Sequence, residues 1–138
     1  MRRFAFIVCS GLLFWATVLN AAVAEAQKYP DRAVQLIVAN VPGSIMDLNA
    51  RSVTDDLGKT LGTQIVVVNK PGAGTTLGTA EVVRSKKDGY TIGYLSAGGL
   101  VYQRVSNPGT VPYDPERDLE PLALHVFVPL TVAVQASS

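Results

Sequence analysis

The apolar positions of this chain fall into short continuous runs that are separated by segments with helical spacing. The first run, Leu36 to Ala39, is apolar at every position, which is typical of a central parallel strand covered on both faces. Further runs follow at Ile65 to Val68 and at Tyr90 to Leu95. Because a helical pattern separates each run from the next, the sequence predicts right-handed βαβ crossovers, a mostly parallel sheet and flanking helices.

The first helical segment carries start and stop signals. Ser44 is a good N-cap, and Asp47 completes the Ser-x-x-Asp form of a capping box. Gly62 stands where a left-handed residue ends a helix. The apolar residues between these signals share one face: Ala50, Val53, Leu57 and Leu61. The pattern predicts an amphipathic helix on the sheet, and the spacing alone leaves open whether Asp47 does more than cap it.

A glycine-rich stretch from Lys70 to Thr76 leads into a second predicted helix, Leu77 to Arg84, with Thr75 or Thr76 as its N-cap. A short helical piece is expected after Gly99, followed by a long loop from Asn107 to Asp118. The remaining apolar runs predict two more strands, Leu122 to Val128 and Leu130 to Val134.

Three loops are expected to meet at the carboxyl ends of the strands, where open α/β sheets bind ligands. These loops begin at Asn40, Lys70 and Ser96. Backbone N–H groups at the start of a helix lack intrahelical acceptors and lie at the positive end of the helix dipole. The sequence therefore predicts that the first loop can receive a carboxylate or a phosphate.

The N-terminal segment from Met1 to Ala26 has the pattern of a secretory signal peptide. Arg2 and Arg3 precede an apolar stretch that ends in small residues with A-x-A patterns, and a retained membrane anchor is the alternative. Cleavage would leave ten of the 12 basic and ten of the 11 acidic residues, a neutral chain that no bulk charge draws to nucleic acid or membrane. The single cysteine, Cys9, lies in this segment, so the remainder has no disulfide framework.

Catalytic and cofactor motifs are weak in this sequence. Gly72 to Gly78 forms G-x-G-x-x-x-G, but Leu77 occupies the third glycine position of a dinucleotide fingerprint, and no acidic residue follows the third strand to hold a ribose. His125 is the only histidine and is expected in the core of an apolar strand, so no triad or metal cluster can be built around it. We expect no enzyme, no cofactor and no metal site.

Several short motifs occur in an order that resembles one family. They are Tyr29-Pro30, Pro42-Gly43 with Asp47 and Ala50-Arg51, Asn69-Lys70-Pro71-Gly72-Ala73-Gly74 with Gly78, Asp88-Gly89-Tyr90-Thr91, and Pro112-Tyr113-Asp114-Pro115 with Arg117-Asp118 and Pro121. In this order they resemble the substrate-binding proteins of tripartite tricarboxylate transporters, the Bug receptors, over Tyr29 to Ser138. The resemblance implies a two-lobed periplasmic binding protein of type II that closes on a small carboxylate.

The resemblance also implies site residues and domains. Two loops would act as jaws, and a third would add wall contacts: Val41, Pro42, Gly43, Ser44 and Asp47 in the first, Ala73, Gly74, Thr75 and Thr76 in the second, and Ser96 and Ala97 in the third. Residues 1–26 would be the signal peptide and residues 27–138 an incomplete N-terminal lobe, since members are much longer. Met46 departs from the usual small hydroxyl residue and is expected to narrow the first loop.

The function that follows is that of a periplasmic receptor fragment. Its partners would be a small di- or tricarboxylate and the membrane subunits of the transporter, with no nucleic acid. Two alternatives remain open at this stage: an inert product of a truncated gene, and a fragment of an α/β nucleotide-binding enzyme.

Overall fold

The computed structural model describes residues 28–127 and Gln135. The predicted signal peptide, the last residue of the predicted strand Leu122 to Val128, and the whole predicted strand Leu130 to Val134 lie outside the described residues. The chain divides into two units, Met1–Asp31 and Arg32–Ser138, and the fold below is that of the second unit.

A three-stranded parallel sheet forms the centre of this unit. Strand β1 (Val34–Val38) lies between β2 (Ile65–Asn69) and β3 (Thr91–Tyr94). In register, Leu36 faces Val67 on one side and Ile92 on the other. The predicted parallel sheet with a central first strand is confirmed. Four of the five residues of β1 are buried, and only Gln35 is polar and exposed.

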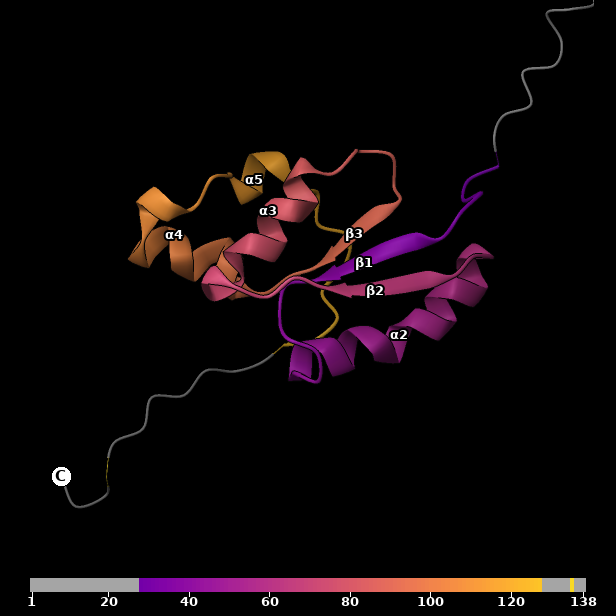
Figure 1. The fold of residues 1–138 in the computed structure, drawn as a ribbon, viewed down its shortest axis with the longest axis horizontal. Helices are drawn as coiled ribbons and strands as arrows, with labels where there is room; N and C mark the ends of the chain where they lie inside the picture. The colour runs from indigo at the N-terminus through magenta and orange to yellow at the C-terminus, as the bar shows by residue number, and fades with distance from the viewer. Residues whose placement is uncertain (1–27, 128–134, 136–138) are drawn as a thin grey trace, which may run out of the picture. The chain divides into compact units, whose positions relative to one another are not determined.

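The two long helices cover opposite faces of the sheet. Helix α2 (Ile45–Leu61) connects β1 to β2, and helix α3 (Thr76–Arg84) connects β2 to β3 on the other side of β1. A right-handed crossover places the helix on one face when the chain moves in one direction along the sheet, and on the other face when it moves back. Figure 1 shows α2 below the sheet and α3 above it.

Successive side chains of β1 point to opposite faces of the sheet, so β1 contributes to the core on both faces. Leu36 and Val38 pack with Ala50 of α2. On the other face, Ala39 lies so close to Gly78 of α3 that a Cβ at Gly78 would come within 2.7 Å of its Cα. The sheet is therefore sandwiched between two helices, which leaves the ends of its strands as the accessible edge.

The ends of α2 follow the sequence signals. The hydroxyl of Ser44 accepts the N–H of Asp47 at 3.3 Å, and Gly62 ends the helix at a φ of 69°. The N-cap of α3 is at the expected position, Thr75, but it lacks the expected side-chain cap. Thr75 precedes α3, but its φ of 75° is left-handed, and its side chain makes no capping hydrogen bond.

The chain after β3 is more helical than its composition suggested. A π-helical segment η2 (Gly98–Tyr102) continues into α4 (Gln103–Ser106). The stretch predicted as one long loop contains a 3₁₀ turn, η3 (Pro108–Thr110), and a short helix, α5 (Pro115–Asp118). Proline at the first turn of both explains the difference, because its fixed φ suits a helix start as well as a loop.

The predicted strand Leu122 to Val128 is wrong for its described part. Residues 122–127 form no strand, and the side chains of Leu122, Leu124 and Phe127 are 76, 82 and 80% exposed. His125 is not a core residue either: it is exposed, and its Nδ1 lies 2.7 Å from the hydroxyl of Tyr94. An apolar run shows what a segment tends to bury, and it forms a strand only where a neighbouring strand pairs with it.

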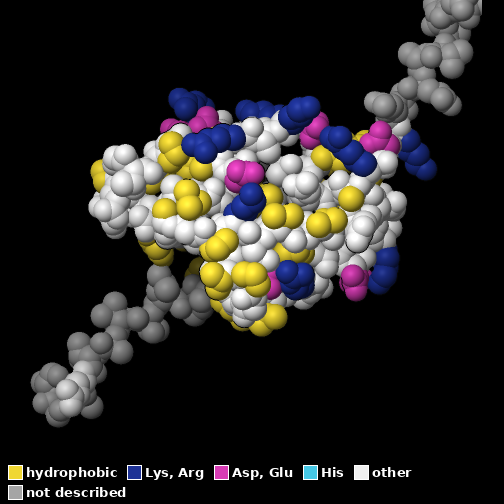
Figure 2. Space-filling view, viewed as in Figure 1, with side chains coloured by type: hydrophobic (Ala, Val, Ile, Leu, Met, Phe, Trp, Pro, Cys, Tyr) yellow, Lys and Arg dark blue, Asp and Glu magenta, His cyan; other side chains and the backbone are white. Residues whose placement is uncertain are grey.

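The surface of the unit is mixed in charge. Figure 2 shows basic and acidic side chains interspersed on the visible face, with apolar side chains gathered over the start of α2, where Ile45 and Leu48 are exposed. Within residues 28–127 no helix combines the length and the apolarity needed to cross a membrane.

Candidate functional site

The first loop leaves the carboxyl end of β1 and turns tightly into α2. Gly43 adopts a φ of 77°, which glycine reaches without steric cost. The N–H of Ser44 donates to the carbonyl of Val41 at 3.3 Å, and the N–H of Val41 donates to the side chain of Asn40 at 2.8 Å. Val41, Pro42 and Gly43 remain exposed. The turn thus holds a short stretch of backbone at the open edge of the sheet.

Asp47 lies beneath this loop and is only 3% exposed. Its Oδ2 accepts the N–H of Gly43 at 2.9 Å and Nε of Arg51 at 3.0 Å, while its Oδ1 accepts Nδ2 of Asn69 at 3.0 Å. The hydrogen bonds from Arg51, Gly43 and Asn69, in that order, outweigh burial and lower the pKa of Asp47 to about 2. The carboxylate is therefore ionised at neutral pH.

The capping box forms in an altered version. Ser44 caps Asp47 as expected, but the carboxylate reaches back to the N–H of Gly43 and not to that of the cap residue. Both carboxylate oxygens are occupied by donors, and the side chain of Arg51 balances the charge. Asp47 holds the first loop in place from below.

Met46 lies between the sheet and the start of the first loop. Its side chain packs against the core cluster of Leu36, Val38 and Ala50. Its Sδ also accepts Nδ2 of Asn40, at the start of the first loop, at 3.7 Å. The expectation that Met46 narrows the first loop stays a prediction.

The second loop has an unusual backbone. Gly72, Ala73, Gly74 and Thr75 all have positive φ, at 128°, 48°, 60° and 75°. For Ala73 and Thr75 this conformation is strained, and strain of this kind costs on the order of 1–3 kcal/mol for each residue. Strained backbone is found most often at ligand-binding and active sites. The backbone geometry therefore indicates a candidate ligand-binding loop, independently of its glycine content.

Two hydroxyls in the second loop are also exceptional. Oγ1 of Thr75 and Oγ1 of Thr76 are buried and have no hydrogen-bond partner within the described part of the chain. Thr76 as a whole is only 4% exposed. Buried hydroxyls are normally paired, because an unpaired one loses its hydration without compensation. These hydroxyls are groups that a ligand or an ordered water can satisfy.

The third loop packs directly on the second. A Cβ at Gly98 or Gly99 would lie 3.0 or 2.9 Å from Oγ1 of Thr75, so only glycine permits this close approach. The buried hydroxyl of Tyr113 donates to the carbonyl of Gly99 at 2.8 Å and fixes the third loop. Ser96 is half-buried and Ala97 is exposed.

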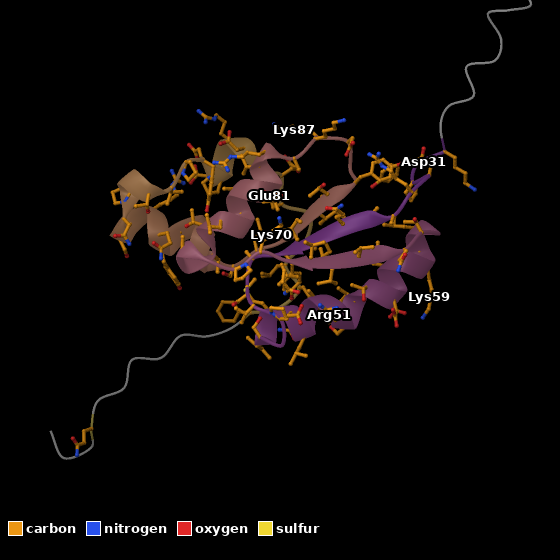
Figure 3. All side chains as sticks on the ribbon, viewed as in Figure 1. Asp31, Arg51, Lys59, Lys70, Glu81 and Lys87 are labelled. Atoms are coloured by element: carbon orange, nitrogen blue, oxygen red, sulfur yellow. The ribbon has the colours of Figure 1, made fainter. Side chains whose placement is uncertain are left out.

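The three predicted loops thus lie at the carboxyl ends of β1, β2 and β3, as expected. The first two loops follow adjacent strands, and the helices after these strands cover opposite faces of the sheet. On the α3 side, Lys70 and Glu81 face each other at 3.6 Å (Figure 3). Contact of the loop residues with a ligand stays a prediction.

Sequence reasoning gave no role to three residues that support these loops. Asn69 joins β2 to the first loop, Tyr113 fixes the third, and Gln103 lies against Gly74. Asn69 and Tyr113 stand within motifs that were noticed, so a signal existed, but only the fold shows what they contact. Gln103 carries no sequence signal.

Two hollows of about 340 and 370 Å³ lie away from the three loops. One is lined by residues near the amino ends of β1 and β3, including Arg32 and Asp88, and the other by residues around Tyr113. Arg32 is paired with Asp88 at 3.1 Å and stacks on Tyr90 at 4.1 Å from the ring centre. Among the described residues, no group of three or more His, Cys, Asp or Glu is arranged to hold a metal ion.

Comparison with known proteins identifies the family. The model for the tripartite tricarboxylate transporter family receptor, TctC, matches residues 49–138. The chain belongs to this family. The match includes the second and third loops, and the resemblance noted in the sequence is confirmed. This is a family of receptors, which supports a binding role and not a catalytic one.

Relatives with known sequences are much longer than this TctC-family chain. A UPF0065 protein of Bordetella bronchiseptica is 41% identical over 120 residues, which cover 87% of this chain and 36% of that protein. Protein BugT of Bordetella pertussis is 36% identical over 120 residues, covering 87% and 37%. The chain therefore spans about a third of the length of the relatives it matches.

Solved structures of the family confirm the fold class. A structure described as a periplasmic transporter is 38% identical with a TM-score of 0.61, and the match covers 63% of this chain and 29% of that one. MatC from Rhodopseudomonas palustris, solved with bound malate, is 31% identical with a TM-score of 0.58, covering 70% and 33%. The observed unit is thus a periplasmic-binding-protein-like α/β lobe in partial form.

Proposed function

We propose that this chain is the N-terminal lobe of a periplasmic receptor that captures a small carboxylate for a tripartite tricarboxylate transporter. The observation that carries the proposal is the meeting of the first and second loops at the carboxyl edge of β1 and β2. The malate in MatC supports the ligand class. The predicted signal peptide, residues 1–26, supports export to the periplasm, and the membrane subunits of the transporter are the proposed partners.

The first loop offers backbone donors to an anion. The amides of Ile45 and Met46 open α2 and have no acceptor among the described residues, whereas those of Asp47 and Leu48 are bonded to Ser44. Free amides at the positive end of a 17-residue helix attract a carboxylate. In this proposal Val41, Pro42, Gly43 and Ser44 form the first jaw, and Asp47 positions it.

The second loop provides the facing jaw. Ala73 and Gly74 present backbone, and Thr75 and Thr76 add the two unpaired hydroxyls. Ser96 and Ala97 form the wall beside them. Among the described residues no base is bonded to the hydroxyls of Thr75 and Thr76, and donors engage both oxygens of Asp47. The proposed task is therefore binding without chemistry.

Titration of the ¹⁵N-labelled chain with malate tests the proposal. Nuclear magnetic resonance detects weak binding, and we expect the amide signals of residues 41–46 and 73–76 to move together on malate addition. Gly74→Val should abolish these shifts, because valine is strained at a φ of 60° and its Cβ would displace the side-chain amide of Gln103.

The matched control is Gly109→Val, since a Cβ at Gly109 meets nothing within 4 Å. Thermal melting of both variants separates lost binding from lost folding. Equal shifts in Gly74→Val and the parent chain would contradict the jaw role, and shifts confined to the hollow around Arg32 would contradict the location of the site.

A further inference from the structure

Asn69 is the last residue of β2 and directly precedes the second loop. Its side chain nevertheless bonds to the first loop and its support. Nδ2 donates to the carbonyl of Asn40 at 3.1 Å and to Oδ1 of Asp47 at 3.0 Å, and Oδ1 accepts Nη2 of Arg51 at 3.3 Å. The side-chain amide of Asn69 thus connects the end of β2 with the first loop, which follows β1.

The hydrogen bonds continue from Asn69 into the ligand-facing backbone. Asp47 receives Asn69 on Oδ1 and the N–H of Gly43 on Oδ2. Arg51 closes a ring, because its Nε bonds to Asp47 and its Nη2 to Asn69. A displacement of Asn69 is therefore transmitted to Gly43 through groups that are fully engaged.

The strands do not need this ring to pair. The ladder between β1 and β2 extends past the strand end through its own backbone bond, from the N–H of Lys70 to the carbonyl of Val38 at 2.8 Å. What Asn69 adds is a fixed position of the exposed first loop relative to the start of the second. A backbone ladder cannot supply this, since it ends before either loop turns.

We propose that Asn69 is a positioning residue that sets the spacing between the two ligand loops by holding Asn40 and Asp47 against the end of β2. The inference rests on the proposed function for its ligand, but the spacing itself is a property of the chain. Asn69 does not touch the ligand. It orients the groups that do.

The test replaces Asn69 with a carboxylate. In Asn69→Asp, two carboxylates meet at the site where Asp47 is faced by Arg51, with Lys70 adjacent in the chain and paired with Glu81. Two carboxylates at hydrogen-bond distance cannot both ionise at little cost, so one retains a proton to a higher pH. The matched control is Asn49→Asp, which adds the same charge to α2 outside the ring.

The readout is the pH dependence of amide signals in the ¹⁵N-labelled full chain. In the parent chain the Gly43 signal should be constant above about pH 4, where Asp47 is ionised. In Asn69→Asp we expect the signals of Gly43, Ala73 and Gly74 to titrate with one shared midpoint between about pH 5 and 7, and in Asn49→Asp none of them to do so. A shared midpoint shows that one ionisation at the end of β2 reaches both loops, whereas the same charge added to α2 reaches neither.

Asn69→Ser is the milder second variant, since serine keeps one donor. It should displace the Gly43 and Gly74 signals and weaken malate binding about tenfold, as expected for lost hydrogen bonds to a charged group. Unchanged loop signals in both variants, or malate affinity equal to that of the parent chain, would overturn the proposal. If the parent chain itself shows no malate shifts, the proposed function fails, while the shared titration of the two loops still decides the role of Asn69.

Discussion

Asp47 keeps its charge beneath the first loop because three donors converge on its carboxylate. A buried carboxylate without such partners would hold its proton to a higher pH. Here the opposite occurs, and the negative charge becomes a fixed support for the Gly43 turn. The residue that most resembles a ligand-binding acid is therefore part of the scaffold.

The lowered pKa of Asp47 predicts how stability depends on pH. Its folded pKa of about 2 lies below the ordinary value of 3.8, so the ionised form stabilises the folded state. This contribution is present above the unfolded pKa and is lost as the pH falls from about 4 to about 2. We expect the free energy of unfolding, measured by urea titration at several pH values, to fall over this range in the parent chain.

Asp47→Asn should be less stable than the parent chain at neutral pH, and the difference should shrink on acidification. Arg117 also lowers the pKa of Asp118. This group contributes equally to the stability of the parent chain and of Asp47→Asn, so it does not affect the difference between them. Asp55→Asn, an exposed substitution on the same helix, is the control and should follow the parent curve. A parallel offset between Asp47→Asn and the parent at every pH would contradict the ionised role.

In the second loop, the sequence predicts the backbone conformation of the glycines but not that of the residues beside them. Gly72 and Gly74 indicate a turn with positive φ because glycine adopts it freely. Ala73 and Thr75 share that conformation, yet neither residue type favours it, so local propensity argues against the observed backbone. Thr75 packs against Gly98 and Gly99, a tertiary contact that no local pattern encodes.

Among the elements, α3 depends on one close approach. A Cβ at Gly78 would lie 2.7 Å from Cα of Ala39 and 2.8 Å from the carbonyl oxygen of Lys70. Because these are mainly backbone atoms, they cannot move aside without shifting β1 or the second loop. We expect Gly78→Ala to lower the free energy of unfolding by about 1–3 kcal/mol, although alanine is the better helix former.

Urea unfolding measures this effect, and Gly109→Ala is its control. A Cβ at Gly109 is free of contacts, so its effect should stay within about 0.5 kcal/mol. A stabilised Gly78→Ala variant would show that helix propensity outweighs the contact with β1.

The repeating strand and helix elements and a short helical piece after Gly99 were predictable from the sequence. The π-helical form of that piece and the helical turns within residues 107–118 were not. Consecutive apolar runs and the Ser44 and Gly62 signals correctly predicted the sheet and α2, because burial and capping leave local traces. The π-helical segment η2 is held by the hydrogen bond from the hydroxyl of Tyr113 to the carbonyl of Gly99, and these two residues are 14 positions apart in the sequence. The exposed stretch 122–127 shares the apolar character of β1 but lacks its neighbouring strands.

At the scale of the molecule, the proposed function gives this chain one side of a binding site. It covers 36% of its relative from B. bronchiseptica, and the family resemblance implies that a second lobe closes on the ligand. An anion held by one lobe stays half solvated, which weakens every polar contact to it. We expect calorimetric titration of the 138-residue chain with malate to give a dissociation constant of about 1 mM or weaker.

Hydrogen exchange complements this titration. Strong protection is expected in Leu36 to Ala39 and Ile65 to Val68, and little in residues 122–127, which form no strand. Micromolar binding together with uniform protection through Phe127 would show that the single lobe is a complete receptor.

The strand order has a consequence for concentrated solutions. With β1 in the middle, β2 and β3 each have one edge without a partner strand among the described residues. The two edges differ and face away from each other, so if β2 of one chain pairs with β3 of the next, both outer edges remain open. Such a contact does not close into a dimer. A contact of this kind adds one chain at a time, so its product is an open row of chains and not a defined oligomer.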